Sequence, residues 1–195
     1  VDINSTQKIS VPELKSFVNL VNEFFHSGKR PLVLFGAGVG LAGAERETEK
    51  WLKDSKIPFV TSWNGMTYFN HESENYCGII GVYGNRGANF LIQNCDRLLV
   101  LGSRLDNRQR SGNATSFAES ARVLVVDVDN EELIKYRNNS NYEPGINLDL
   151  IALKTAALEI HTPPQDESWN IYWREIKAKY FGKFPSSIPD KYGTI

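Results

Sequence analysis

The sequence predicts an α/β fold with an open, mostly parallel sheet and helices on both of its faces. Short, continuously apolar runs such as 97–101 and 122–127 are typical of strands that are buried on both sides. Helical stretches alternate with these runs, as they do in a parallel sheet wrapped by helices. Glycines directly follow the first run, 31–35, where such sheets place their ligand-binding loops. Together these observations predict a Rossmann-like domain.

The first elements are an amphipathic helix and the strand after it. Over residues 10–27, apolar side chains recur at three- and four-residue spacing, which predicts a helix with one buried face. Ser10 and Glu13 form a capping box at its start, and Gly28 ends it. The elements that follow are predicted as a strand over 31–35, a polar helix over 43–55 and a strand over 58–62.

The same alternation continues to about residue 160. Helices are predicted over 88–94, 115–120 and 131–136, and strands over 97–101 and 122–127. An edge strand over 142–148 and a closing helix over 150–160 end the sheet, and a further helix follows over 169–180. We therefore divide the chain into an N-terminal tail (1–9), a central, nucleotide-binding-like domain (10–162), and a linker helix with a tail (163–195).

Composition and charge exclude several classes of function. The 195 residues carry 22 Lys and Arg against 23 Asp and Glu, so the diffuse basic field of a nucleic-acid binder is absent and no nucleic-acid partner is expected. The apolar runs are far shorter than the roughly 20 residues that cross a bilayer, and the first residues lack an apolar signal core. We expect no membrane partner and a cytoplasmic location.

The cysteines and histidines follow no metal-binding or redox spacing. Cys77 and Cys95 match neither a zinc site nor a redox CxxC, and we expect both to be reduced, buried thiols. The three histidines are isolated in the sequence. We therefore predict no metal site.

Candidate binding residues follow the strands, because ligands of open parallel sheets sit beyond the carboxyl ends of the strands. Gly36 and Gly38 would let backbone N–H groups approach a phosphate, although a tight turn without a ligand explains them equally well. The dinucleotide fingerprint G-x-G-x-x-G is not completed, because Leu41 takes its third glycine position. No Asp or Glu ends the second strand, so an NAD-type site is disfavoured.

Charged and amide side chains in the later loops are further candidates for ligand binding at the carboxyl edge of the sheet. Arg104 and Arg108 flank Asp106, and guanidinium groups suit phosphate oxygens or a flat ring, with surface ion pairs as the alternative. Asp127 and Asp129 could accept from ribose or adenine, although helix capping is the favoured reading of these two. The turn Gly84, Asn85 and Arg86 could supply backbone donors or simply form a bend. No catalytic triad or nucleophile motif accompanies these residues, so no catalytic residue is predicted.

Taken in order, these loops resemble a known family. The resemblance rests on Arg30-Pro31, Gly36-x-Gly38, Ile57-Pro58-x-Val60-Thr61, Gly65, Gly78-x-x-Gly81-x-x-Gly84-x-Arg86-x-Ala88-Asn89, Asp96, Leu101-Gly102-x-Arg104, Asp127-x-Asp129 and Glu132. Over about residues 10–160 the chain is similar to the central domain of thiamine-diphosphate-dependent enzymes, particularly the acetolactate synthase group. The number and order of the matches carry the resemblance, since each alone is weak.

The resemblance implies a longer parent enzyme. Such enzymes join a pyrimidine-binding domain, this central domain and a domain that binds the diphosphate through Mg²⁺, and they form homodimers or tetramers. The chain would hold only the middle part, with 163–195 leading towards the missing C-terminal domain, and would not catalyse alone. The parent would use thiamine diphosphate and Mg²⁺ to decarboxylate a 2-oxo acid and transfer the product.

Family members hold FAD, ADP or no cofactor in this domain. By resemblance, the residues at the positions where FAD-binding members contact their cofactor are Gly36, Gly38, Gly84, Asn85, Arg86, Arg104, Asp106, Arg108, Asp127 and Asp129. Tyr83 and Asn85 stand where acetolactate synthases usually have His and Thr, which suits a diverged member with a different 2-oxo acid or acyl substrate. Two alternatives are a stand-alone nucleotide-binding module and a sirtuin-like NAD-dependent deacylase, whose expected catalytic residues and zinc cysteines are not recognisable.

Overall fold

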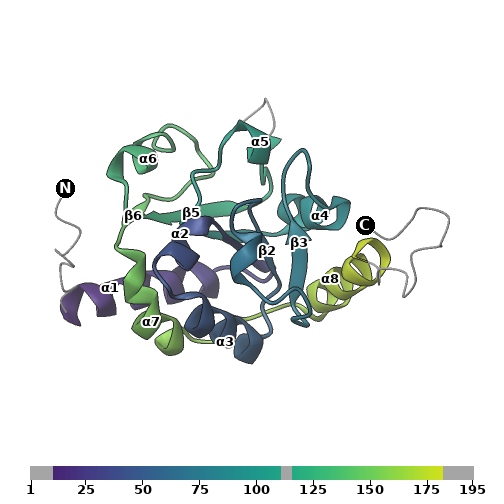
Figure 1. Ribbon diagram of the computed structural model, residues 1–195, viewed down its shortest axis with the longest axis horizontal. Helices are drawn as coiled ribbons and strands as arrows, with labels where there is room; N and C mark the ends of the chain where they lie inside the picture. Colours follow the sequence, from purple (N-terminus) through teal and green to yellow (C-terminus); the bar gives the residue numbers. More distant parts are fainter. Residues whose placement is uncertain (1–10, 111–115, 182–195) are drawn as a thin grey trace, which may run out of the picture.

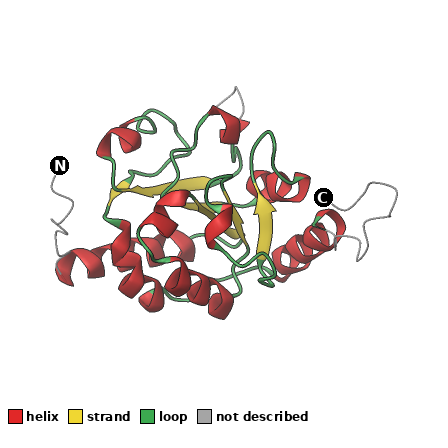
Figure 2. Ribbon diagram, in the orientation of Figure 1, coloured by secondary structure: helices red, strands yellow, loops and turns green. Residues whose placement is uncertain are grey.

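A six-stranded parallel sheet forms the centre of the molecule (Figure 2). The computed structural model describes residues 11–110 and 116–181. The strand order is β3-β2-β1-β4-β5-β6, and every paired neighbour is parallel. The strands are β1 (Pro31–Phe35), β2 (Phe59–Thr61), β3 (Tyr76–Ile79), β4 (Arg97–Leu101), β5 (Arg122–Asp127) and β6 (Ile146–Asn147). The predicted open, parallel, Rossmann-like α/β fold is confirmed.

Helices cover both faces of the sheet (Figure 1). The α-helices are α1 (Val11–His26), α2 (Ala37–Leu41), α3 (Glu45–Ser55), α4 (Arg86–Asn94), α5 (Asn107–Arg110), α6 (Asn130–Ile134), α7 (Leu153–Ala156) and α8 (Glu167–Tyr180). Single 3₁₀ turns lie at η1 (Met66–Tyr68), η3 (Leu150–Ala152) and η4 (Ala157–Glu159). No helix in the described ranges is long and apolar enough to span a membrane.

The two faces of the sheet bury two separate apolar clusters. Side chains of a strand alternate between the faces, so Val33 and Phe35 point into one cluster, and Leu32 and Leu34 into the other. The first cluster is completed by α1, α3 and α7, and the second by α4 and α8. Because both faces are covered, the strands read as continuous apolar runs in the sequence.

Several predicted elements differ in detail from the observed ones. The strand β3 was not predicted, because its four residues include Gly78 and form no apolar run. The predicted helix 43–55 is preceded by the separate short helix α2, and Gly43, with φ of 64°, lies between α2 and α3. The predicted helix 150–160 is a succession of η3, α7 and η4.

Other predicted segments are shorter than expected or fall outside the described ranges. Of the edge strand predicted over 142–148, only Ile146–Asn147 pairs as a strand, and Tyr142 forms an isolated bridge to Val123. Residues 116–120 form turns rather than an α-helix. The capping residue Ser10, Thr115 and the tails 1–9 and 182–195 lie outside the described residues.

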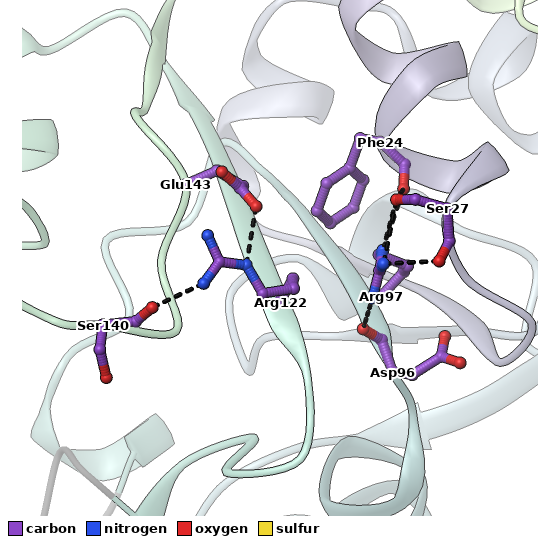
Figure 3. Close-up of polar contacts among 7 residues, drawn as sticks. All are labelled: Phe24, Ser27, Asp96, Arg97, Arg122, Ser140 and Glu143. Atoms are coloured by element: carbon purple, nitrogen blue, oxygen red, sulfur yellow. Dashed lines mark hydrogen bonds and ion pairs between the residues drawn. The ribbon is translucent and has the colours of Figure 1, made fainter.

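Two arginines at the amino ends of neighbouring strands fix the edge of the sheet opposite the loops that carry the predicted site residues (Figure 3). Arg97 begins β4 and donates to the carbonyl oxygens of Phe24, Ser27 and Asp96, which ties the end of α1 to the sheet. Arg122 begins β5 and donates to Glu143 at 2.7 Å and to the Ser140 carbonyl. These hydrogen bonds stabilise the amino edge of the sheet. The predicted site residues lie at the opposite, carboxyl edge.

Candidate functional site

The glycines after β1 pack against the loop after β4. The Gly36 N–H donates to the Leu101 carbonyl at 2.8 Å, and the Gly38 N–H donates to the Gly102 carbonyl at 3.1 Å. A Cβ atom on Gly36 would lie 1.9 Å from the Gly102 oxygen. Both N–H groups are paired inside the protein, so the predicted phosphate contact lacks these two donors, and close packing explains the glycines.

The loop after β3 is braced by two asparagines. The Asn85 Oδ1 accepts from the Ile79 N–H at 2.8 Å, while the Asn89 amide both donates to and accepts from the backbone of Gly81. Gly84 closes a turn by donating to the Gly81 carbonyl. Gly84 and Asn85 therefore hold the shape of the loop, which is the role that the alternative of a simple bend gives them.

Arg86 begins α4 directly after this loop. Its side chain is exposed, and the described residues offer its guanidinium no hydrogen bond or ion pair. Arg86 does not line the cavity described below. The structure therefore leaves this predicted site residue apart from the others.

A charged cluster lies beyond β5. The Asp127 carboxylate is buried and accepts from the Asp129 N–H at 2.9 Å, and the Asp129 carboxylate accepts from the Glu131 N–H, which caps α6. Arg104 pairs with Asp129 at 3.6 Å and with Glu132 at 3.9 Å. The capping role expected of Asp129 is confirmed, and Arg104 makes the ion pairs that were the alternative to ligand binding.

Arg108 and Asp106 do not belong to this charged cluster, although they lie in the same loop as Arg104. The Asp106 carboxylate accepts from the Arg108 and Gln109 N–H groups at 2.8 and 3.1 Å, which begins the short helix α5. Leu105, which separates Arg104 from Asp106, is fully buried and has a left-handed φ of 46°, a conformation that is uncommon for a branched side chain. The buried Leu105 anchors the loop, with Arg104 bound to α6 on one side and Arg108 free on the other.

A cavity of about 430 Å³ gathers residues from the loops after three strands. Its lining residues are Trp63 and Asn64 after β2, Ile80 and Tyr83 after β3, and Asp106, Arg108 and Gln109 after β4. This volume falls within the range of about 300–1,000 Å³ that is typical of small-molecule sites. The described residues give the exposed Arg108 guanidinium no hydrogen bond or ion pair.

The structure therefore divides the ten predicted site residues into groups. Asp106 and Arg108 line the cavity, and Arg104, Asp127 and Asp129 form the cluster beyond β5. The glycines Gly36, Gly38 and Gly84, together with Asn85, shape the loops. The tenth residue, Arg86, belongs to none of these groups. Trp63 and Tyr83 also line the cavity, although neither is among the predicted site residues. The signal that the sequence offers is a large ring within two residues of a glycine, Gly65 or Gly84, in a loop that follows a strand.

The cysteines and the acidic groups offer no metal centre among the described residues. Cys77 and Cys95 are free and buried, as predicted. Burial raises the pKa of Cys77 to about 12 and also raises the pKa of Cys95, so both thiols stay protonated at neutral pH. In the described parts of the chain, no three His, Cys, Asp or Glu side chains gather in a way that could hold a metal ion.

The parallel sheet and the loops at its carboxyl edge define the chain as a Rossmann-like α/β domain. Residues 18–143 match the family model for the central domain of thiamine pyrophosphate enzymes, and the chain belongs to this family. The chain is 31% identical over 183 residues to the acetolactate synthase large subunit of Cyanidium caldarium, a match that covers 92% of this chain and 30% of the relative.

A second relative gives the same result. The acetolactate synthase isozyme 2 large subunit of Escherichia coli (strain K12) is 31% identical over 167 residues, covering 86% of this chain and 29% of the relative. The resemblance to the acetolactate synthase group is thereby confirmed. The chain spans about a third of the length of these relatives.

Proposed function

We propose that this chain acts as the central domain of a longer thiamine-diphosphate-dependent enzyme that decarboxylates a 2-oxo acid and transfers the product to an acceptor. Its relatives are named acetolactate synthase large subunits, and the chain covers only about a third of each. The parent would be a homodimer or tetramer whose pyrimidine- and diphosphate-binding domains lie in the remaining two thirds. The central domain alone would not catalyse.

The described residues do not fit the metal-bound diphosphate of such a parent. No three of their acidic, cysteine or histidine side chains could hold a metal ion such as Mg²⁺. Thiamine diphosphate, when bound in the parent, would supply the electron sink for decarboxylation. This chain would contribute to the reaction only by supporting the other domains and by binding a ligand of its own.

We further propose that the ligand of this domain is FAD or ADP. The observation that carries this proposal is the cavity beyond β2, β3 and β4, with the unpaired Arg108 at its wall. A guanidinium in such a place suits a phosphate, because its planar fork of donors matches phosphate oxygens. The lining includes the aromatic rings of Trp63 and Tyr83 and the apolar Ile80, which suit a heteroaromatic ring.

A calorimetric titration of the chain with FAD, ADP and NAD tests this proposal. We expect saturable binding of FAD or ADP and none of NAD, because no acidic residue follows β2 to hold the ribose. Arg108→Gln should weaken binding by roughly 10- to 100-fold, since a charge-assisted hydrogen bond contributes about 1.5–3 kcal/mol. Arg137→Gln, an exposed arginine outside the cavity, is the matched control. A chain that binds neither FAD nor ADP would remove the nucleotide from the proposal.

The enzymatic part of the proposal has its own test. The chain alone, supplied with thiamine diphosphate, Mg²⁺ and pyruvate or another 2-oxo acid, should release no CO₂ above the buffer control. Release of CO₂ by the chain alone would contradict the proposal that the central domain does not catalyse without the other domains. A longer native reading frame around this sequence would exclude the stand-alone nucleotide-binding module. The family match gives the sirtuin-like alternative no support.

A further inference from the structure

We propose that Trp63 and Tyr83 are the ring-binding walls of the cavity, and that they make this site selective for a planar aromatic ring that carries an anionic group. The inference rests on the proposed nucleotide function and adds the residues that would recognise the ring. Arg108 would bind the anionic group from the wall formed by the loop after β4. Neither aromatic residue was among the predicted site residues.

Trp63 differs from the other tryptophans of the chain. All four tryptophans lie in the described residues, and Trp51, Trp169 and Trp173 are each at most 4% exposed, whereas Trp63 is 57% exposed. The residues around Trp63 are fixed: the Ser62 N–H donates to the Phe35 carbonyl, and the Gly65 N–H donates to both oxygens of Ser62. An exposed indole on a fixed turn at the wall of a cavity is a preformed contact surface.

Tyr83 is held in a similar way. Its side chain is 76% exposed, at the tip of the loop that Asn85 and Asn89 brace. The neighbouring Val82 N–H donates to the Arg108 carbonyl at 2.9 Å, which ties the tip of this loop to the segment that carries the guanidinium. The backbone segments that carry the tyrosine ring and the cation therefore belong to one hydrogen-bonded unit.

The composition of the cavity wall defines the chemistry of the ligand. Two exposed rings offer stacking surfaces, the Asn64 amide offers a donor and an acceptor, and Arg108 offers the positive charge. The Gln109 amide offers its N–H donors, because its Oε1 already accepts from the Ser103 hydroxyl at 2.7 Å. The Asp106 carboxylate also lines the cavity, but it accepts from the backbone N–H groups of Arg108 and Gln109. An aliphatic acid would leave the rings unused, and an uncharged ring would leave the guanidinium unused. A purine or flavin ring that carries phosphate uses all of these groups.

Quenching of tryptophan fluorescence tests the inference directly. Because Trp63 is the exposed tryptophan, acrylamide should quench mainly its emission. Saturation with ADP should protect this emission from acrylamide, while inorganic pyrophosphate, which has no ring, should not. Saturable ADP binding without protection of Trp63 would overturn the ring assignment and leave the nucleotide proposal in place.

Variants then separate the ring from the anion. Trp63→Leu and Tyr83→Leu should each weaken the binding of ADP and of FAD about tenfold, in line with the stacking of a base on an aromatic side chain. The same variants should leave the affinity for pyrophosphate unchanged. Phe90→Leu, a partly exposed aromatic on α4 that does not line the cavity, is the control and should bind as the unmodified chain does.

Two results would contradict the inference in different ways. Unchanged ADP and FAD affinities in both leucine variants would show that the rings do not contact the ligand, although a nucleotide binds. An unmodified chain that binds neither ADP nor FAD would overturn both the nucleotide proposal and the ring assignment, while the family membership would stand.

Discussion

Gly36 shows how a single missing side chain sets the carboxyl edge of the sheet. Its backbone is extended, with φ of −92°, so the residue is not needed for its conformational freedom. What it provides is space, because a Cβ atom would lie 1.9 Å from the Gly102 carbonyl oxygen. The loops after β1 and β4 meet at the point where the strand order reverses, and this contact brings them together.

We expect Gly36→Ala to lower the free energy of unfolding by about 3 kcal/mol, near the upper end of the usual cost of overpacking, because the clash is with backbone that cannot swing away. Gly145→Ala is the matched control. Its Cβ would meet only the Leu133 side chain, at 2.8 Å, which can change rotamer, so the cost should be about 1 kcal/mol. Urea denaturation of the two variants measures the difference, and equal costs would contradict the packing role of Gly36.

The two buried thiols predict a loss of stability at alkaline pH. Burial raises the pKa of Cys77 to about 12 and raises that of Cys95, whereas a thiol in the unfolded chain has a pKa near 8.5. Above about pH 8.5 the unfolded chain releases these protons and the folded chain keeps them, so rising pH favours unfolding. Each thiol lowers the unfolding free energy by up to about 1.4 kcal/mol per pH unit.

Urea denaturation at pH 7, 8.5 and 9.5 measures this effect. The double variant Cys77→Ala, Cys95→Ala should start from a lower stability, because it leaves cavities, but its stability should fall less steeply with pH. Other buried groups also titrate at alkaline pH, namely Lys177, whose pKa is lowered by burial, and the buried tyrosines. These groups are present in both proteins, so we assign the difference between the two slopes of unfolding free energy against pH to the thiols. Parallel slopes would refute the assignment.

At the scale of elements, α8 is part of the packed structure. Its side chains Trp169 and Trp173 are each 1% exposed and belong to the cluster on the α4 face of the sheet. The Trp169 indole donates to the Pro31 carbonyl at 3.1 Å, and the Lys177 amine donates to the carbonyls of Ser73 and Glu74. The helix therefore contacts both the start of β1 and the turn before β3.

Trp173→Ala should destabilise the chain by about 3–5 kcal/mol, because it empties a large buried volume. Ile171→Ala on the same helix changes a side chain that is half exposed, and should alter stability by no more than about 0.5 kcal/mol. Thermal or chemical unfolding of both variants distinguishes a packed helix from a loosely attached one. Similar small effects in the two variants would mean that α8 adds little to the fold.

The elements that the sequence predicts best are those with a full apolar run or a long periodic face. The strands β1 and β4 match their predicted bounds because all or nearly all of their residues are buried on both sides of the sheet. The strand β3 was missed because one of its four residues is Gly78, and its pairing depends on the neighbouring β2 rather than on a local pattern. The edge strand β6 is only two residues long, too short to define a period.

The sequence predicts at which edge of the sheet the candidate site lies, but not which loops form its cavity. Topology places every loop that follows a strand at the carboxyl edge, so the sequence alone locates Asp106, Arg108 and Asp127 at this edge. The sequence does not show which loops share a cavity, because that depends on strand order. Since β2 and β4 both flank β1, the loops after β2, β3 and β4 line the cavity together, and this placement brings in Trp63 and Tyr83.

For the whole molecule, two groups of candidate binding residues lie on the same edge but on different loops. The cavity with Arg108 opens beyond β2, β3 and β4, and the cluster of Arg104, Asp127 and Asp129 lies beyond β5. The segment after β4 carries both Arg104 and Arg108 and so connects the two groups. We propose that a single nucleotide such as ADP would occupy the cavity, and that a longer dinucleotide such as FAD would extend from the cavity to the cluster.

Ligand-dependent stability of the whole chain distinguishes these two cases. At a hundred times its Kd, a nucleotide should stabilise the fold by about 2.7 kcal/mol, which raises the Tm by roughly 5–10 °C in a chain of this size. Arg108→Gln should reduce the rise to about half or less for both ligands at the same concentrations, because a tenfold weaker affinity leaves about 1.4 kcal/mol. Arg104→Ala should reduce the rise for FAD and leave that for ADP unchanged. An ADP effect that falls equally in both variants would place the nucleotide across the cluster beyond β5, and not in the cavity beside Trp63 and Tyr83.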